Sequence, residues 1–283
     1  MLNGGFEFIS GKEFILFTLK RSQKDVLSLS VIIYLQKVYR IVINTKQKKI
    51  AILTTFLGCL FLIVFFSNKT LQFLVKDKIW AHKINSIKKL NKASTTYPGV
   101  ELDVVYYNNY FDVNHPPDKS NNLKLEEYFL SQKTHENRLY WIDFKNLNKS
   151  NHINSANKLD SLVKHFTINK KNVIVESTNA FFLKSFFHKG FPTSYYLPIN
   201  LHLLNKEELK TTIHIIRDNI DSNNNTYISS NYKDYNILKE YFPNQKKLCW
   251  FTTIGSMNKF KARLLLYKTA LDKNVEVLLI PFH

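Results

Sequence analysis

The strongest constraint on the fold is a regular alternation of strand-like and helix-like segments through residues 79–283. Short runs rich in β-branched and aromatic residues are separated by longer segments with the apolar spacing of helices. The strand-like runs are residues 79–82, 100–107, 139–145, 172–178, 193–198, 226–231, 247–252 and 276–282. The helix-like segments are residues 86–93, 125–132, 156–166, 180–188, 206–220, 235–241 and 259–271. Eight strands joined by helices predict an α/β protein with a closed parallel barrel, the (β/α)8 TIM barrel.

An uncharged apolar run, IAILTTFLGCLFLIVFF, precedes this region at residues 50–66. Its seventeen residues are at the lower end of the length that crosses a bilayer as a helix. The residues that follow, Ser67, Asn68 and Lys69, do not resemble the small-residue cleavage site of a secretory signal. We therefore expect an uncleaved transmembrane helix. The expected organisation is a basic N-terminal segment at 1–49, a transmembrane anchor at 50–66, a linker at 67–78 and a barrel domain at 79–283.

The cations beside the apolar run favour one orientation in the membrane. Five lysines or arginines precede the run closely, and three lysines follow it. Because cytoplasmic flanks carry the excess of positive charge, we expect a single-pass membrane protein with a cytoplasmic N-terminus. The barrel domain would then lie on the periplasmic or extracellular side.

The whole chain is strongly basic, with 40 Lys and Arg against 22 Asp and Glu and a net charge of +18. This balance indicates an anionic partner, such as a phosphate compound, a lipid surface or nucleic acid. Nucleic acid is the least favoured of the three, because the sequence contains no recognition motif for it. With seven glycines in the chain, a dinucleotide-binding fingerprint is also absent.

Acidic side chains lie in the predicted strands, whose carboxyl ends carry the function in such barrels. Glu101 and Asp103 are two residues apart in the second strand, as are Asp143 and Lys145 in the third, so each pair shares a face. If these faces line the barrel interior, three carboxylates meet one ammonium group and require a cation. All-oxygen ligation favours Mg²⁺ or Ca²⁺. A structural ion pair between Asp143 and Lys145 is the main alternative for those two residues.

Other titratable residues accompany this acidic cluster. His82 ends the first strand and His115 follows the second, and histidine, with a pKa of about 6.5, suits a catalytic base and acid. Lys145 could bind a phosphate oxygen. Glu176, in the fourth strand, could add a ligand or accept a hydrogen bond from substrate, and a structural role is equally open. Taken singly, His82 could be a core histidine and His115 a residue at the rim.

Four motifs in order, WAHKINS, GVELDVVY, VNHPP and WIDFKNL, resemble menorin-like proteins. These proteins are relatives of glycerophosphodiester phosphodiesterases and spider-venom-type phospholipases D, and the resemblance covers roughly residues 79–200. It implies a phospholipase-C-like barrel with an acid/base pair at His82 and His115 and a phosphate-binding Lys145. Its implied metal ligands are Glu101, Asp103 and Asp143. The sequence departs from the phosphodiesterase pattern at Lys83, which replaces an arginine, and no Pro-Glu-Asn follows.

Two functions are consistent with these features. The first is a membrane-anchored, metal-dependent phosphodiesterase that acts on a glycerophosphodiester or phospholipid-like substrate by histidine acid/base catalysis. The alternative is a non-catalytic, menorin-like binding or signalling barrel at the membrane.

Overall fold

The computed structural model describes residues 34, 37–38, 46–132, 135, 137–197, 200–223, 225–251 and 259–282. The chain forms two compact units, Met1–Ile63 and Val64–His283. Most of the predicted basic segment 1–49 lies outside the described residues, as do residues 198 and 252 at the ends of two predicted strands.

A long apolar helix, α2 (Lys46–Phe66), accounts for most of the described part of the first unit and continues into the second. The stretch Lys48–Phe66 has 19 residues and a mean hydropathy of 2.4, and none of it is buried. By length and composition this helix is able to cross a membrane.

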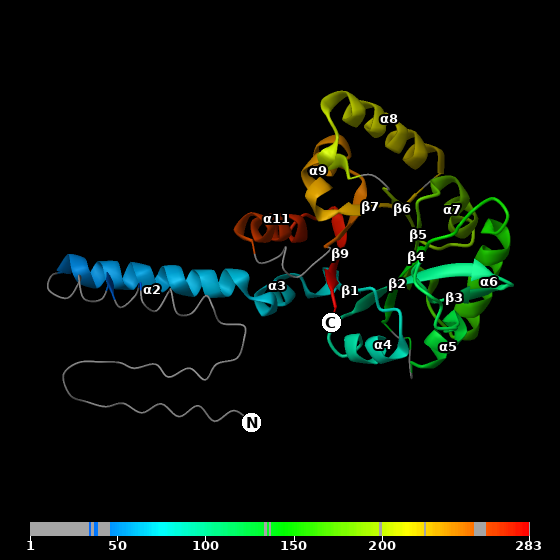
Figure 1. Ribbon diagram of the computed structural model, residues 1–283, viewed down its shortest axis with the longest axis horizontal. Coiled ribbons are helices and arrows are strands. Elements are labelled where there is room, and N and C mark those ends of the chain that lie inside the picture. The colour runs from blue at the N-terminus through cyan, green and yellow to red at the C-terminus, as the bar shows by residue number, and fades with distance from the viewer. Residues whose placement is uncertain are drawn as a thin grey trace. The chain divides into compact units, whose positions relative to one another are not determined.

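The second unit is a closed barrel of eight parallel strands (Figure 1). Each strand pairs in parallel with the next along the chain, and β1 pairs with both β9 and β2, which closes the ring. The predicted (β/α)8 barrel is therefore confirmed, and each strand ends within two residues of its predicted bounds. The strands are β1 (Ile79–His82), β2 (Gly99–Tyr107), β4 (Leu139–Phe144), β5 (Val173–Ser177), β6 (Thr193–Tyr196), β7 (Tyr227–Asn231), β8 (Lys246–Trp250) and β9 (Val275–Pro281).

Helices lie outside the ring of strands (Figure 1). The predicted helix at 156–166 begins four residues earlier than expected, because its first turn is mostly polar and lacks an apolar periodicity. The helices are α4 (Ile87–Ala93), α5 (Leu125–Leu130), α6 (His152–His165), α7 (Ala180–Phe187), α8 (Lys206–Asn223), α9 (Tyr235–Tyr241) and α11 (Phe260–Ala270). A short strand, β3 (Tyr110–Asp112), pairs antiparallel with the end of β2. The turn between β2 and β3 places Asn108 and Asn109 at φ of 48° and 63°, a conformation that asparagine tolerates.

Apolar side chains fill the barrel below its carboxyl end. Trp80, Trp141 and Leu279 belong to one buried cluster within the ring, whereas neighbouring strand residues such as Ile142 pack outward against the helices. Gly99 begins β2 beside the Trp80 indole, where an added Cβ would lie 2.2 Å from Cδ2. Only glycine fits at this position without displacement of the indole.

The segment predicted as a linker, 67–78, forms a helix, α3 (Asn68–Val75), and a 3-10 turn (Lys76–Lys78). Ser67 caps the helix by accepting a hydrogen bond from the Thr70 backbone at 3.4 Å. Leu71 is buried in a core cluster that also contains Leu266 of α11. This segment is thus packed onto the barrel unit.

Candidate functional site

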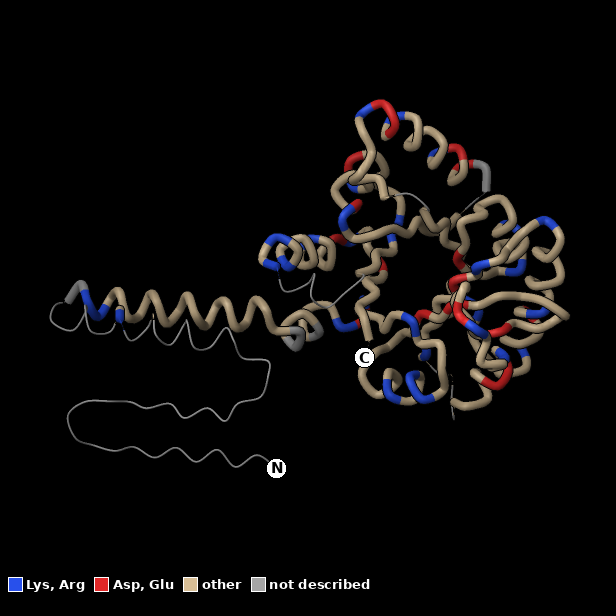
Figure 2. The backbone as a smooth tube through the Cα atoms, in the orientation of Figure 1, with Lys and Arg blue, Asp and Glu red and all other residues tan. Residues whose placement is uncertain are grey.

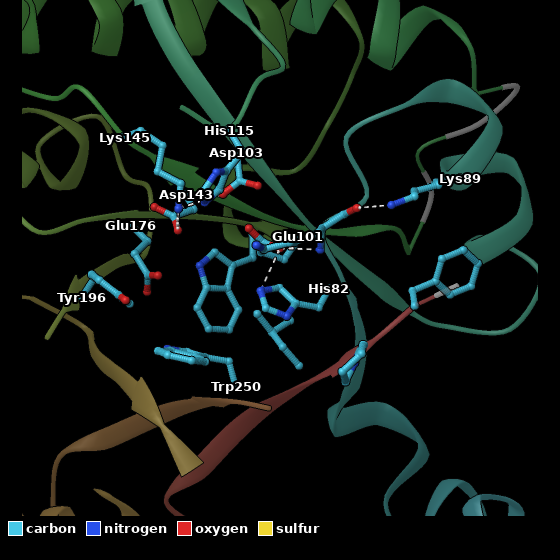
Figure 3. Close-up of a pocket in the computed structure, with 15 residues that line it drawn as sticks. His82, Lys89, Glu101, Asp103, His115, Asp143, Lys145, Glu176, Tyr196 and Trp250 are labelled. Atoms are coloured by element: carbon cyan, nitrogen blue, oxygen red, sulfur yellow. Dashed lines mark hydrogen bonds and ion pairs between the residues drawn. The ribbon is translucent and has the colours of Figure 1, made fainter. Parts of the chain in front are cut away.

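A cavity of about 370 Å³ opens among the strands of the barrel (Figure 3). It lies toward the carboxyl ends of these strands, where such barrels carry their sites. All seven residues singled out from the sequence line this one cavity: His82, Glu101, Asp103, His115, Asp143, Lys145 and Glu176.

Strand register brings the acidic residues together. Asp103 of β2 is the register partner of Asp143 of β4, which is in turn the partner of Glu176 of β5. Glu101 lies two residues before Asp103 and on the same face. One carboxylate oxygen from each of Glu101, Asp103 and Asp143 lies within 4.8 Å of the other two. The neighbouring strands therefore supply a compact acidic triad.

The triad fits a hard divalent cation. Oxygens that share one ion can be separated by at most twice the metal–oxygen distance, about 4.2 Å for Mg²⁺ and about 5.2 Å for Ca²⁺. The observed limit of 4.8 Å lies within the bound for Ca²⁺, whereas Mg²⁺ would require the oxygens to move closer together. Three carboxylates also supply the oxygen ligands that Mg²⁺ and Ca²⁺ prefer in proteins.

Two neighbouring residues hold the triad in place. The Lys83 backbone N–H donates to Glu101 Oε2 at 2.7 Å, and Lys83 adopts a φ of 58° to present this group. The Asn85 side chain donates to Asp103 Oδ2 at 2.6 Å and accepts from the Asp103 backbone N–H at 2.9 Å. Such contacts orient carboxylates toward a shared ligand.

Lys145 supplies the positive charge nearest to the triad. Its ammonium group pairs with Asp103 Oδ1 at 2.8 Å and also with Asp143. Burial alone would lower the pKa of Lys145, but the charges of Asp143 and Asp103 outweigh it and raise the pKa. The ion pair considered as an alternative is thus present within the acidic triad. An ammonium group has three donors, so two carboxylate contacts leave one for a ligand oxygen.

Negative charge is in excess despite Lys145. Burial and the charges of Asp103 and Asp143 raise the pKa of Glu101 well above its usual range. Burial likewise raises the pKa of Asp143, although Lys145 opposes it. A cation bound among these oxygens would stabilise the ionised form of both groups.

The two histidines lie near the triad. His82 Nε2 is 3.7 Å from Glu101 Oε2. Burial, only partly offset by Asp103, lowers the pKa of His82 to about 4, so its imidazole is neutral near pH 7. His115 is half-buried and lines the same cavity. Figure 3 shows His115 beside Asp103, with His82 closer to Glu101.

A second wall of the cavity combines aromatic rings with Glu176. The rings of Tyr196 and Trp250 are stacked with centroids 6.2 Å apart, and Trp141 lines the same cavity. Burial and the charge of Asp143 raise the pKa of Glu176 to about 8. Among the described residues, Glu176 Oε2 and both indole Nε1 atoms are buried without a hydrogen-bond partner. This wall therefore presents polar atoms that a bound ligand could satisfy.

Asn85, Trp141 and Tyr196 were not identified from the sequence. Trp141 is two residues before Asp143 and so on the same strand face, a signal that could have revealed it. Asn85 lies in a loop after β1, and its contact with Asp103 depends on the path of that loop. Trp250 also lines the cavity.

The fold matches solved structures, although no family model and no curated protein matches the sequence. One match is a glycerophosphodiester phosphodiesterase from Parabacteroides distasonis, with 19% identity and a TM-score of 0.51 over 71% of this chain and 91% of that one. Another is an Oleispira antarctica phosphodiesterase in complex with the product sn-glycerol-3-phosphate, with 11% identity and a TM-score of 0.50 over 71% and 92%. The chain thus shares the TIM-barrel fold of glycerophosphodiester phosphodiesterases. The menorin resemblance stays a prediction.

Proposed function

We propose that this protein is a membrane-anchored, metal-dependent phosphodiesterase that hydrolyses a glycerophosphodiester or a phospholipid-like headgroup. The observation that carries this proposal is the acidic triad at Glu101, Asp103 and Asp143, which shares one cavity with Lys145 and two histidines. The fold supports it, because the solved structures of the same fold are described as phosphodiesterases.

The cavity suits a small phosphodiester. Its volume of about 370 Å³ is near the lower end for small-molecule sites, so it accommodates a headgroup rather than acyl chains. Lys145 would donate its remaining N–H to a nonbridging phosphate oxygen. Glu176 and the indole N–H groups of Trp141 and Trp250 would contact hydroxyl groups of the ligand.

Hydrolysis requires two proton transfers on opposite sides of phosphorus. The neutral imidazole of His82 would take a proton from the attacking water as the new O–P bond forms. His115 would give a proton to the alcohol oxygen as its bond to phosphorus breaks. When bound to the triad, Mg²⁺ or Ca²⁺ would neutralise charge on the nonbridging oxygens.

The membrane part of the proposal rests on α2. Its apolar stretch Lys48–Phe66 would be an uncleaved anchor with a cytoplasmic N-terminus. The barrel would then lie on the periplasmic or extracellular side. There it would reach phosphodiesters released at, or still attached to, the bilayer.

The alternative is a barrel that binds a phosphodiester without cleaving it. Lys83 favours this alternative, because it stands where the phosphodiesterase motif has an arginine. A binding barrel would keep the roles of Lys145 and the triad but would not depend on the two histidines for turnover.

One experiment separates these functions. The full chain in detergent micelles is assayed with Mg²⁺ or Ca²⁺ against a panel of glycerophosphodiesters and short-chain phospholipids. We expect hydrolysis that His82→Ala and His115→Ala each abolish and that chelation removes. The matched control, His188→Ala, changes an exposed histidine on the outside of the barrel and should keep full activity. Calorimetric binding without product in any sample would refute the enzyme and favour the binding barrel.

A further inference from the structure

We propose that the outer faces of α3 and α11 lie on an anionic lipid bilayer, so that the barrel is docked on the membrane surface beside its anchor. The inference rests on the membrane-anchor part of the proposed function and is independent of catalysis. The docking face consists of Phe73 and Leu74 on α3 and of Phe260, Leu264 and Leu271 on and directly after α11.

α11 contacts the C-terminal end of α2. Arg263, which is 1% exposed, donates from Nε to the Phe65 carbonyl at 2.9 Å and from Nη2 to the Ser67 carbonyl at 2.5 Å. The Tyr267 hydroxyl donates to the same Phe65 carbonyl at 3.0 Å. The Phe65 ring lies 5.2 Å from the rings of both Phe260 and Tyr267. These contacts satisfy carbonyls at the helix C-terminus, which favours cationic partners.

The length of the apolar stretch in α2 indicates how deep in the membrane these residues would lie. The apolar stretch ends at Phe66, and its 19 residues span about 28 Å at 1.5 Å per residue, close to the thickness of a bilayer core. If this stretch crosses the membrane, Phe65 and Ser67 lie at the boundary between core and headgroups. Arg263 is within hydrogen-bond distance of both carbonyls, so this part of α11 must lie at the same level. The start of α3 follows at once in the chain.

The exposed faces of α3 and α11 carry large apolar side chains. Phe260 and Leu264 are four residues apart, with Leu271 seven further on, so they share one side of α11. Each is more than half exposed. On α3, Phe73 is 87% exposed while Leu71 is buried on the opposite side. Large apolar side chains at this level would enter the interfacial region of a bilayer.

The charge of these two helices indicates which partner binds to the docking face. Neither α3 nor α11 contains an Asp or Glu, whereas Lys261 and Lys268 are exposed on α11 (Figure 2). Lys76 and Asp77, which follow α3, are both exposed and offset each other. In a contact between two copies of this face, like charges would repel each other. Anionic headgroups complement the same charges. An anionic lipid surface therefore fits this face better than a second copy.

Spin labels on the full chain in vesicles test the docking directly. The vesicles contain phosphatidylcholine and phosphatidylglycerol in a ratio of three to one. Cys59→Ser removes the thiol in α2, and Cys249 is kept because it is buried. Labels are placed by Phe73→Cys and Leu264→Cys. Leu57→Cys in α2 reports on the anchor, and Leu130→Cys on α5 is the matched control, 73% exposed and outside the docking face. The measurement is the collision rate of each label with oxygen, which partitions into lipid, and with a water-soluble nickel chelate.

We expect oxygen collisions to exceed chelate collisions several-fold at positions 57, 73 and 264, with the reverse at 130. Suppose that oxygen collisions dominate at position 57 but chelate collisions dominate at 73 and 264. This result would overturn the docking and leave the anchor intact. An excess of chelate collisions at position 57 would overturn the anchor and the docking together. Protection of 73 and 264 from both reagents, with dipolar broadening between labels, would assign this face to a second copy and also overturn the proposal.

Discussion

The side chain of Asn85 binds Asp103 at two points, through its amide N–H to Oδ2 at 2.6 Å and through its carbonyl to the backbone N–H at 2.9 Å. This contact fixes the rotamer of a carboxylate whose other oxygen pairs with Lys145. Asp103 is thus held on both sides in the orientation that brings it to Glu101 and Asp143. Asn85 is a positioning residue in this arrangement.

Asn85→Ala should weaken cation binding by about 10- to 100-fold, the usual effect of removing a group that orients a ligand. The loss should appear in calorimetric titrations with Ca²⁺ or Mn²⁺, and activity should recover at high cation concentration. Asn91→Ala, which changes an exposed amide on α4, serves as the control. Equal affinities for the two variants would show that Asn85 does not position the triad.

Lys145→Met should make folding more dependent on cation. Without Lys145, Asp103 and Asp143 lose their nearest positive charge, and unfolding free energy should fall by about 3 kcal/mol in a chelator. Added Mg²⁺ or Ca²⁺ would then replace the lost charge. The melting temperature should therefore rise more with cation in this variant than in the parent chain. A smaller rise than in the parent would mean that the triad does not bind the ion.

The fall of kcat/KM at acidic pH should follow the protonation of His82. A base must be unprotonated, so kcat/KM falls as pH drops through its pKa. Because burial lowers the pKa of His82 to about 4, the rate should hold down to roughly pH 5 at saturating cation. A bound cation acts in the same direction, since positive charge disfavours protonation of a neighbouring imidazole. An acidic limb centred near the ordinary value of about 6.5 would exclude His82 as the base.

Gly99→Ala should destabilise the barrel by about 1–3 kcal/mol, the usual cost of overpacking. Its Cβ would come within 2.6 Å of three atoms of the Trp80 indole, so the ring must move. Chemical denaturation measures the loss. Gly58→Ala, whose Cβ meets no atom within 4 Å, is the control and should change little. Stability of Gly99→Ala equal to that of the control would mean that the indole moves at no cost.

The barrel could be predicted because each strand carries its own local signal of β-branched and aromatic residues between helical segments. The convergence of Glu101, Asp103 and Asp143 followed from spacing of two residues within neighbouring strands. The wall formed by Tyr196 and Trp250 could not be predicted in this way. Its position depends on the register among β6, β7 and β8, which no local pattern fixes.

The helix α3 was missed for a related reason. Eight residues give little periodicity, and the burial of Leu71 depends on α11, almost two hundred residues further along the chain. The same applies to the contact of Arg263 with the end of α2. Local sequence predicts secondary structure, but such long-range contacts decide which surfaces remain exposed.

The proposed function depends on Glu101, Asp103 and Asp143 sharing one divalent cation. The most direct test is a crystal of the full chain grown with Mn²⁺, measured at a wavelength where manganese scatters anomalously. The account predicts one strong anomalous peak at about 2.0–2.6 Å from an oxygen of each carboxylate. Absence of a peak there, with Lys145 still bridging Asp103 and Asp143, would contradict it.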